Sequence, residues 1–182
     1  AATKALLPLL QRDRIDWQDT KNLVRALATV APRGHEATIR ALAALIESSE
    51  ASSLAVQAAV TMRALGQKQG IVKLKRQLDE KIRKRKRAAG LYEQRASLLF
   101  AIGDFPQAHS DYQKILDYSE GAAMTRRAYE GLIRCEARRK KIQSMVRQMK
   151  SSGMTPEDFE SLAAIDPPFA RVMTHDRVKS FL

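Results

Sequence analysis

The sequence is poor in the residues that build disulfide-rich, turn-rich or membrane-spanning folds. One cysteine, Cys135, stands among 182 residues, which excludes an internal disulfide and a thiolate zinc site and leads us to expect a reducing, cytoplasmic compartment. Eight glycines and six prolines are too few for an all-β fold with many tight turns. The longest apolar stretches, such as residues 5–10, fall far short of the roughly 20 residues that cross a bilayer. We therefore expect no membrane partner.

The side chains that carry catalytic chemistry form no recognisable motif. His35, His109 and His175 lie far apart, and the sequence has no glycine-rich phosphate loop or serine-nucleophile motif. Cys135 lies beside Ile133 on an apolar helical face, which favours a small buried hydrophobic residue over a reactive thiol. We predict no catalytic residue, no metal site and no cofactor, and hence a protein that is not an enzyme.

What the sequence does contain is helical periodicity along most of its length. Apolar residues recur three or four positions apart, in short segments separated by glycine, proline or serine. No stretch alternates apolar and polar residues for long enough to predict a strand. A serine-rich loop is expected at residues 48–53. The predicted helices span residues 3–11, 17–30, 37–46, 55–65, 71–87, 89–102, 106–116, 122–138 and 142–150, and two more begin near Pro156 and Phe169.

Small and bulky residues follow a fixed order between residues 89 and 122. Ala96 and Ala108 permit two helices to approach closely, and Gly103 permits the positive φ of a short turn between them. The large residues that would fill the remaining space are Tyr92, Leu99 and Tyr112, while Phe105 brackets the turn together with Gly103. This pattern resembles the 34-residue tetratricopeptide repeat. It departs from that repeat at three positions, where an apolar residue, an alanine and a proline are usual: Arg95, Ile115 and Glu120.

The pattern continues beyond the first repeat in a degenerate form. Apolar residues recur one repeat later, at Ile133, Ile142, Val146 and Met149, which predicts a second hairpin with the same packing face. Glu130 and Arg139 take the places of Ala96 and Phe105. Residues 149–156 are also similar to the end of a pentatricopeptide unit, a relative that reads RNA bases. Residues 166–182 are similar to the closing segment of many tetratricopeptide arrays, so we expect them to cover the last apolar face.

The first 87 residues carry a different pattern. Residues 5–10 are leucine-rich, and residues 56–66 form an alanine-rich segment that ends in Leu-Gly, which is similar to HEAT-type repeats. Helical hairpins of no defined type would explain the same spacing. In either case each hairpin buries its apolar stripe against its neighbours. We predict an all-α, right-handed helical-hairpin solenoid: HEAT-like hairpins in residues 1–87, tetratricopeptide-like hairpins in residues 88–152 and capping helices in residues 153–182.

Positive charge is concentrated in two segments. The chain has a formal net charge of +12. Residues 71–87 contain nine basic and two acidic residues, and residues 126–150 contain the same numbers, so each segment carries +7 and the rest of the chain is slightly acidic. Solvated helix faces, or a polar bridge between two arrays, would explain such runs without a binding role. A binding role would explain them if the two segments together form one positive field that attracts anions.

The resemblance implies a protein–protein interaction scaffold, because tetratricopeptide arrays usually bind peptides or helices in a concave groove. An acidic peptide or protein is the predicted partner. The alternative is the phosphate backbone of RNA or DNA, bound through residues 71–87 and 126–150. The chain has no initiator Met, so we expect it to be a piece of a longer protein. The candidate partner-binding residues are the basic run Arg83, Lys84, Arg85, Lys86 and Arg87, and the groove positions Arg95, Arg126, Arg127 and Arg134.

Overall fold

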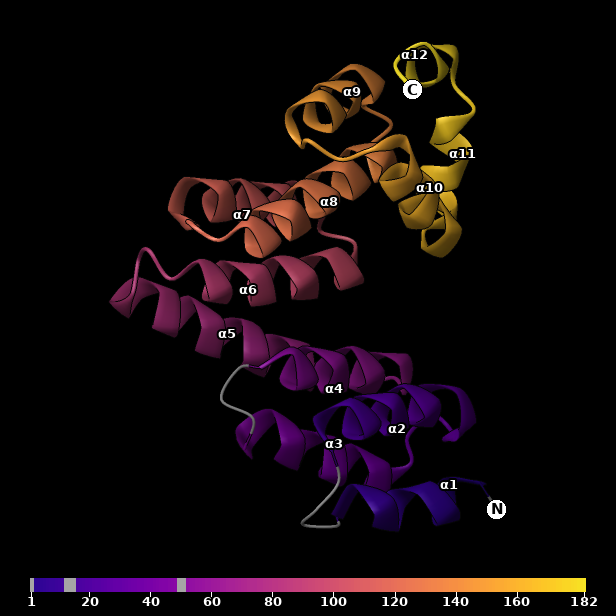
Figure 1. Ribbon diagram of the computed structural model, residues 1–182. Coiled ribbons are helices and arrows are strands. Elements are labelled where there is room, and N and C mark those ends of the chain that lie inside the picture. Colours follow the sequence, from indigo (N-terminus) through magenta and orange to yellow (C-terminus); the bar gives the residue numbers. More distant parts are fainter. Residues whose placement is uncertain (1, 12–15, 49–51) are drawn as a thin grey trace. The chain divides into compact units, whose positions relative to one another are not determined.

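The computed structural model describes residues 2–11, 16–48 and 52–182, and its regular structure is helical (Figure 1). Within these ranges there are twelve α-helices, one short 3-10 helix and no strand, which confirms the predicted all-α class. The chain divides into two compact units, Ala1–Lys86 and Arg87–Leu182. None of the helices in these ranges has both the length and the apolar composition needed to cross a membrane. Residues 49–51 of the predicted serine-rich loop lie outside the described residues.

The first unit is organised around one alanine-rich helix. Its elements are α1 (Ala2–Leu6), the 3-10 helix η1 (Leu7–Gln11), α2 (Trp17–Val30), α3 (Glu36–Ser48), α4 (Ser53–Ala64) and α5 (Gln69–Lys84). Helix α4 packs against α2, α3 and α5. Three neighbours can approach it because Ala55, Ala58 and Ala59 are fully buried and present little bulk. The hydroxyl of Thr61 in α4 donates a buried hydrogen bond of 3.2 Å to the carbonyl of Val24 in α2.

The packing order of the first unit differs from a plain row of sequential hairpins. Helix α2 packs mainly on α4, the second helix after it in the chain, whereas α3 packs on α4 and on η1. At the start of α5, a Cβ on Gly70 would lie 2.8 Å from the sulfur of Met62 and 3.1 Å from Cδ1 of Ile46. The absence of a side chain at Gly70 therefore lets α5 approach α3 and α4 closely.

The second unit begins with a tight helical hairpin. Its helices are α6 (Ala89–Ile102), α7 (Phe105–Tyr118), α8 (Ala122–Arg138), α9 (Ile142–Ser151), α10 (Pro156–Ile165), α11 (Pro167–Met173) and α12 (Asp176–Lys179). Helix α7 packs against both α6 and α8. Ala96 and Ala108 are fully buried, as their predicted role requires, and Gly103 ends α6 with a φ of 88°.

Close packing of α7 against α8 depends on a glycine. A Cβ built on Gly131 of α8 would lie 2.4 Å from the ring of Tyr112 in α7, so no larger residue fits without a shift of one helix. Tyr112 itself is buried. The hydrophobic positions Tyr112 and Leu99 were expected in the core, whereas the contribution of Gly131 was not predicted.

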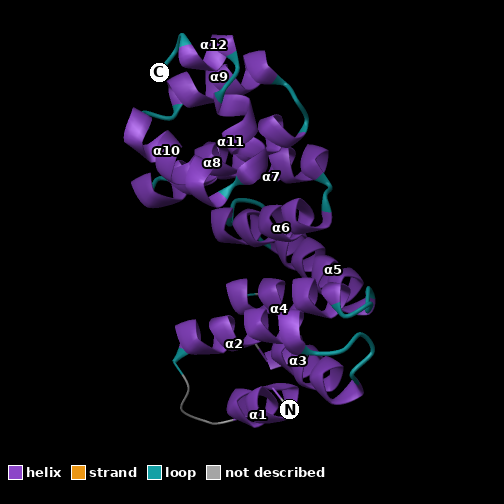
Figure 2. Ribbon diagram, turned by 90° about the vertical axis from the view of Figure 1, so that its right-hand side faces the viewer, coloured by secondary structure: helices purple, strands orange, loops and turns teal. Residues whose placement is uncertain are grey.

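The three C-terminal helices share a core with α8 and α9. This core contains the buried residues Ile133, Ala137, Met145, Met149, Phe159, Leu162, Phe169 and Val178. Phe159 of α10 and Phe169 of α11 are among the largest fully buried side chains of the chain. Helix α11 packs on α8 and α12 packs on α9. Helix α12 lies beside α9 in both views (Figures 1 and 2). The apolar face of α8 and α9 is thereby covered by residues 156–182.

Several helix boundaries differ from the sequence prediction, most of them by one to three residues: the helix predicted over residues 71–87, for example, is α5, which ends at Lys84. Two further differences have local reasons. The segment predicted as one helix over residues 3–11 changes from α-helix to 3-10 helix at Leu7, next to Pro8, whose ring nitrogen has no hydrogen to donate. The last predicted helix is interrupted at Thr174 and His175. There the ring Nδ1 of His175 accepts a hydrogen bond of 3.3 Å from the backbone N–H of Arg177 and begins the separate helix α12.

Candidate partner-binding surface

Arg95, the first predicted groove residue, joins the two helices of the α6–α7 hairpin. Its guanidinium donates two hydrogen bonds of 2.7 Å to the two carboxylate oxygens of Asp111 in α7. Asp111 is buried, and Arg95 also lies over the ring of Tyr92 at 5.6 Å. A bidentate pair of this kind is both directional and strong. Arginine at this position, where the repeat usually has an apolar residue, is therefore explained by a carboxylate on the facing helix.

Arg127 connects α8 to α6. Its Nε donates a hydrogen bond to Oε1 of Glu93, and this bond together with the nearby negative charge raises the pKa of the Arg127 guanidinium above its ordinary value. The two residues are 34 positions apart, the length of one tetratricopeptide repeat.

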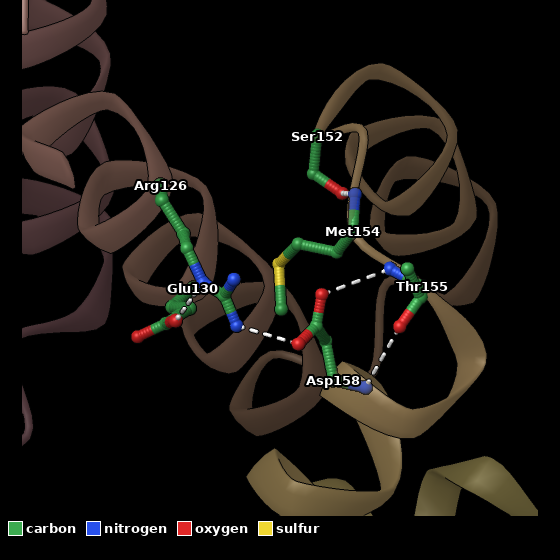
Figure 3. Close-up of polar contacts among 6 residues, drawn as sticks. All are labelled: Arg126, Glu130, Ser152, Met154, Thr155 and Asp158. Carbon is green, nitrogen blue, oxygen red and sulfur yellow. Dashed lines mark hydrogen bonds and ion pairs between the residues drawn. The ribbon is translucent and has the colours of Figure 1, made fainter. Parts of the chain in front are cut away.

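Arg126 connects α8 to the first turn of α10 (Figure 3). It donates to Oε1 of Glu130 at 3.3 Å and to Oδ1 of Asp158 at 2.7 Å. The second oxygen of Asp158 accepts a 3.0 Å hydrogen bond from the backbone N–H of Thr155, whose hydroxyl accepts from the N–H of Asp158 in return. The Thr155 N–H and Arg126 together hold the pKa of Asp158 below its usual range. Arg126 is thus tied to the capping box that begins α10.

Arg134 and a neighbour one turn later, Arg138, both bind Asp166. Arg134 Nε donates to Oδ2 and Arg138 Nη1 donates to Oδ1, and the backbone N–H of Phe169 donates to Oδ1 at 3.1 Å. The Asp166 side chain has no exposed surface, so burial by itself would raise the pKa of this carboxyl. The hydrogen bonds from both arginines outweigh that effect, and the pKa lies below its ordinary value.

The aromatic ring of Phe100 in α6 supports the same two arginines. The guanidinium carbons of Arg134 and Arg138 lie 4.5 and 5.1 Å from the centre of this ring. Asp166, Asp111 and Phe100 were absent from the predicted site. For Asp166 the signal in the sequence was the spacing of opposite charges, because Arg134 and Asp166 are 32 residues apart, close to the 34-residue length of a tetratricopeptide repeat.

The basic run 83–87 differs from the groove arginines in its ion pairing. Arg83 and Lys84 form the last turn of α5, Arg85 is its C-cap and Lys86 closes the first unit, while Arg87 opens the second. All five residues are exposed. The side chains of Arg83, Lys84, Arg85 and Arg87 form no ion pair or hydrogen bond with any described residue, whereas Lys86 has an electrostatic contact. No acidic residue occurs between Glu80 and Glu93.

Earlier cations of α5 are partly neutralised within the first unit. Lys73 pairs with Glu47 of α3, and Arg76 pairs with Glu80 one turn later at 3.0 Å. The bond from Lys73 lowers the pKa of Glu47. Positive charge available to a partner is therefore concentrated at the C-terminal end of α5 rather than along the whole helix. Cations at a helix C-terminus also interact favourably with the helix dipole, so the run is compatible with a stable α5.

The residues considered for catalysis occupy structural positions. Burial raises the pKa of the Cys135 thiol to about 12, which leaves it protonated and unreactive near neutral pH. His109 Nε2 lies 2.8 Å from Oε1 of the buried Glu136, without the alignment of a hydrogen bond. Across the described ranges no group of three or more histidine, cysteine, aspartate and glutamate side chains is placed to hold a metal ion.

Comparison with known proteins gives no family assignment: the chain matches no protein-family model, no curated protein and no solved structure.

Proposed function

We propose that this chain is a non-enzymatic interaction module that holds an acidic peptide or protein segment against the basic run 83–87. The observation that carries the proposal is the presence of five consecutive exposed cations, with no acidic residue within the two positions before them or the five after them. Arginine and lysine side chains of this kind form charge-assisted hydrogen bonds with carboxylates. A flexible acidic segment could meet several of them at once, which multiplies weak individual contacts.

The groove arginines have a secondary role in this proposal. A partner carboxylate that approaches Arg95 or Arg134 must compete with a carboxylate already hydrogen bonded to it in the same unit. Because a new arginine–carboxylate pair would form only as an existing one breaks, these arginines would add little net affinity for a partner. Arg126 and Arg127 have about half of their side-chain surface exposed, so they remain able to guide an acidic partner without leaving Glu130, Asp158 or Glu93.

We also retain the assignment of residues 88–152 as tetratricopeptide-like hairpins within a right-handed solenoid. Support comes from the burial of Ala96 and Ala108 and from the one-repeat spacing of the ion pair between Glu93 and Arg127. The HEAT-like type of residues 1–87 stays a prediction, as does a reducing, cytoplasmic location. The capping role proposed for residues 153–182 is supported by the core that they share with α8 and α9.

Nucleic acid is the second candidate partner, and the same run favours it. The exposed cations of residues 83–87 could neutralise backbone phosphates. The affinity would then fall steeply with salt and would not depend on base sequence, because the aromatic residues Tyr92 and Tyr112 are buried rather than available for stacking.

A charge-reversal experiment tests the proposal and separates the two partners. The triple variant Arg83→Glu, Arg85→Glu, Arg87→Glu is compared with a control that changes the net charge equally at exposed positions elsewhere, Arg63→Glu, Lys68→Glu, Arg171→Glu. The probes are a fluorescent deca-glutamate peptide and a single-stranded RNA, each titrated at low and at physiological salt. We expect the first triple variant to lose at least about tenfold in affinity for the peptide while the control does not.

Equal losses in the two variants would contradict a specific site at residues 83–87. Tight RNA binding that weakens sharply with salt, combined with weak peptide binding, would instead assign the run to nucleic acid.

A further inference from the structure

A hollow in the second unit is lined almost entirely by basic and polar side chains. It is an open hollow of about 660 Å³ between the loop that joins α8 to α9 and the start of α12. Its lining consists of Lys140, Lys141, Ile142, Gln143, Ser144, Arg147, His175 and Arg177. No acidic residue is among them. The hollow belongs to the second unit and shares no residue with the basic run 83–87, four of whose five residues belong to the first unit.

The cations reach this hollow from three separate elements. Lys140 and Lys141 lie in the α8–α9 loop, and Arg147 lies in the second turn of α9. Arg177 belongs to α12, which packs on α9 (Figure 2). All four side chains are exposed, and none forms an ion pair with another described residue. Four like charges around one open space repel each other, and an anion in that space would remove the repulsion.

The turn before α9 differs from the equivalent turn before α7 in a way that favours an anion. Gly103 and Asp104 end α6 and begin α7, and the Asp104 carboxylate caps α7 by accepting from the N–H of Gln107. In the later turn the two corresponding positions are Lys140 and Lys141, with the same backbone hydrogen bonds, from Lys140 to Ala137 and from Lys141 to Glu136. A negative cap is thus replaced by two positive side chains, and no side chain caps the N–H groups that begin α9.

Lys140 adopts a conformation that glycine would adopt more easily. Its φ is 56°, the only positive value for a non-glycine residue within the described ranges.

His175 adds a further donor to the lining of the hollow. Its Nδ1 accepts a hydrogen bond from the N–H of Arg177, so the proton of the neutral ring lies on Nε2. The nearest acids are outside the lining. Glu136 is buried against His109 and Arg139, and Asp176 lies between His175 and Arg177 in the sequence.

We propose that this hollow binds a small molecule through a pyrophosphate or triphosphate group. Four permanent positive charges match an anion with three or more negative charges better than a single carboxylate, and lysine and arginine are the side chains that bind phosphate oxygens. The volume exceeds that of one phosphate group and falls within the range of small-ligand sites. With Ile142 as the only apolar residue of the lining, the site recognises the phosphates rather than an attached ring.

The test is a titration of the whole chain with sodium tripolyphosphate and with pyrophosphate at constant ionic strength, followed by calorimetry and by the shift in melting temperature. We expect micromolar binding of tripolyphosphate and a higher melting temperature. Sulfate at the same concentration serves as the comparison anion and should bind at least about tenfold more weakly. The double variant Arg147→Glu, Arg177→Glu should lose binding by at least tenfold, whereas the control Arg63→Glu, Arg171→Glu, with the same change in net charge, should retain it.

A second variant guards against loss of fold. Lys140→Gly removes one cation while relieving the positive φ, so it should melt at a higher temperature than the wild type and yet bind tripolyphosphate several-fold more weakly. The proposal is overturned if the wild type binds tripolyphosphate no better than sulfate, if the control loses as much affinity as the Arg147 and Arg177 variant, or if Lys140→Gly binds as well as the wild type. Charge reversal at residues 83–87 should leave this binding within twofold, so the outcome is independent of the proposed function.

Discussion

Arg127 of α8 donates a hydrogen bond from Nε to Oε1 of Glu93 in α6, a residue 34 positions earlier in the chain. The arginine beside it, Arg126, reaches forward to Asp158, and Arg134 reaches forward to Asp166, each 32 positions away. Helix α8 is thus joined by ion pairs to α6 before it and to α10 and the N-terminal end of α11 after it. In the second unit, arginines that we predicted to bind a partner instead hold neighbouring helices of the same chain together.

Asp166 is the most buried carboxylate of this network, and its removal should be costly. We expect Asp166→Ala to lower the free energy of unfolding by about 2–4 kcal/mol, because it leaves Arg134 and Arg138 without their acceptor and removes the cap of α11. The matched control is Asp117→Ala, which breaks an exposed pair with Lys114 and should change stability by less than about 0.5 kcal/mol. Chemical denaturation of both variants measures the difference, and similar small losses would refute a structural role for Asp166.

The Gly131 contact predicts a size limit between α7 and α8. Gly131→Ala places a methyl group against the Tyr112 ring and should destabilise the fold by about 1–3 kcal/mol. Gly90→Ala is the control: no atom lies within 4 Å of the added Cβ, and a helical alanine should stabilise by about 0.5–1 kcal/mol. A smaller side chain at position 112, as in Tyr112→Leu, should recover part of the Gly131→Ala loss. Thermal unfolding with opposite signs for the two glycine variants is the expected result.

The pair of His109 and Glu136 predicts a pH dependence of stability. Burial lowers the pKa of His109; Glu136 acts in the opposite direction, and the charges of Arg139 and Lys141 lower it further. A histidine with a depressed pKa binds its proton less readily when folded, so the stabilising contribution is present above the unfolded value of about 6.5 and is lost as the pH falls toward the folded value.

Stability should therefore decrease as the pH falls from about 7 through the unfolded pKa of histidine, and His109→Gln should reduce that decrease. Denaturation midpoints at several pH values in this interval, measured for the wild type and the variant, give the comparison. Parallel curves for the two proteins would show that His109 does not contribute to the pH dependence.

The helices and their packing residues were largely predictable from the sequence, because they follow local rules. Ala96, Ala108 and Gly103 were assigned to a close-packed hairpin from the resemblance to a tetratricopeptide repeat and from their small size, and they are buried or in the turn as expected. The packing of α2 against α4 was not predictable, since apolar periodicity identifies the buried face of a helix but not its partner.

The assignment of charged residues required knowledge of which helices are neighbours. Arg95 departed from the repeat pattern, and the reason became visible only with Asp111 opposite it on α7. The cations Lys140 and Arg177 are 37 positions apart in the sequence, so a single basic hollow could not be inferred from charge runs. Conversely, the nine basic residues of segment 126–150 counted as one positive surface, whereas five of them pair with acidic side chains in the folded chain: Arg126, Arg127, Arg134, Arg138 and Arg139.

The central claim is that the arginines of α8 stabilise the fold through ion pairs, whereas the arginines of the basic run 83–87 bind the partner. One comparison of two variants tests it most directly. Two variants each lose three positive charges: Arg83→Gln, Arg85→Gln, Arg87→Gln in the basic run, and Arg126→Gln, Arg127→Gln, Arg134→Gln in α8. Both the free energy of unfolding and the affinity for the deca-glutamate peptide are measured for each. We predict that the first variant loses about tenfold in affinity with stability unchanged within about 0.5 kcal/mol, and that the second loses about 1–3 kcal/mol of stability but keeps its affinity within about twofold. Loss of affinity in the α8 variant, with full affinity in the basic-run variant, would contradict the account.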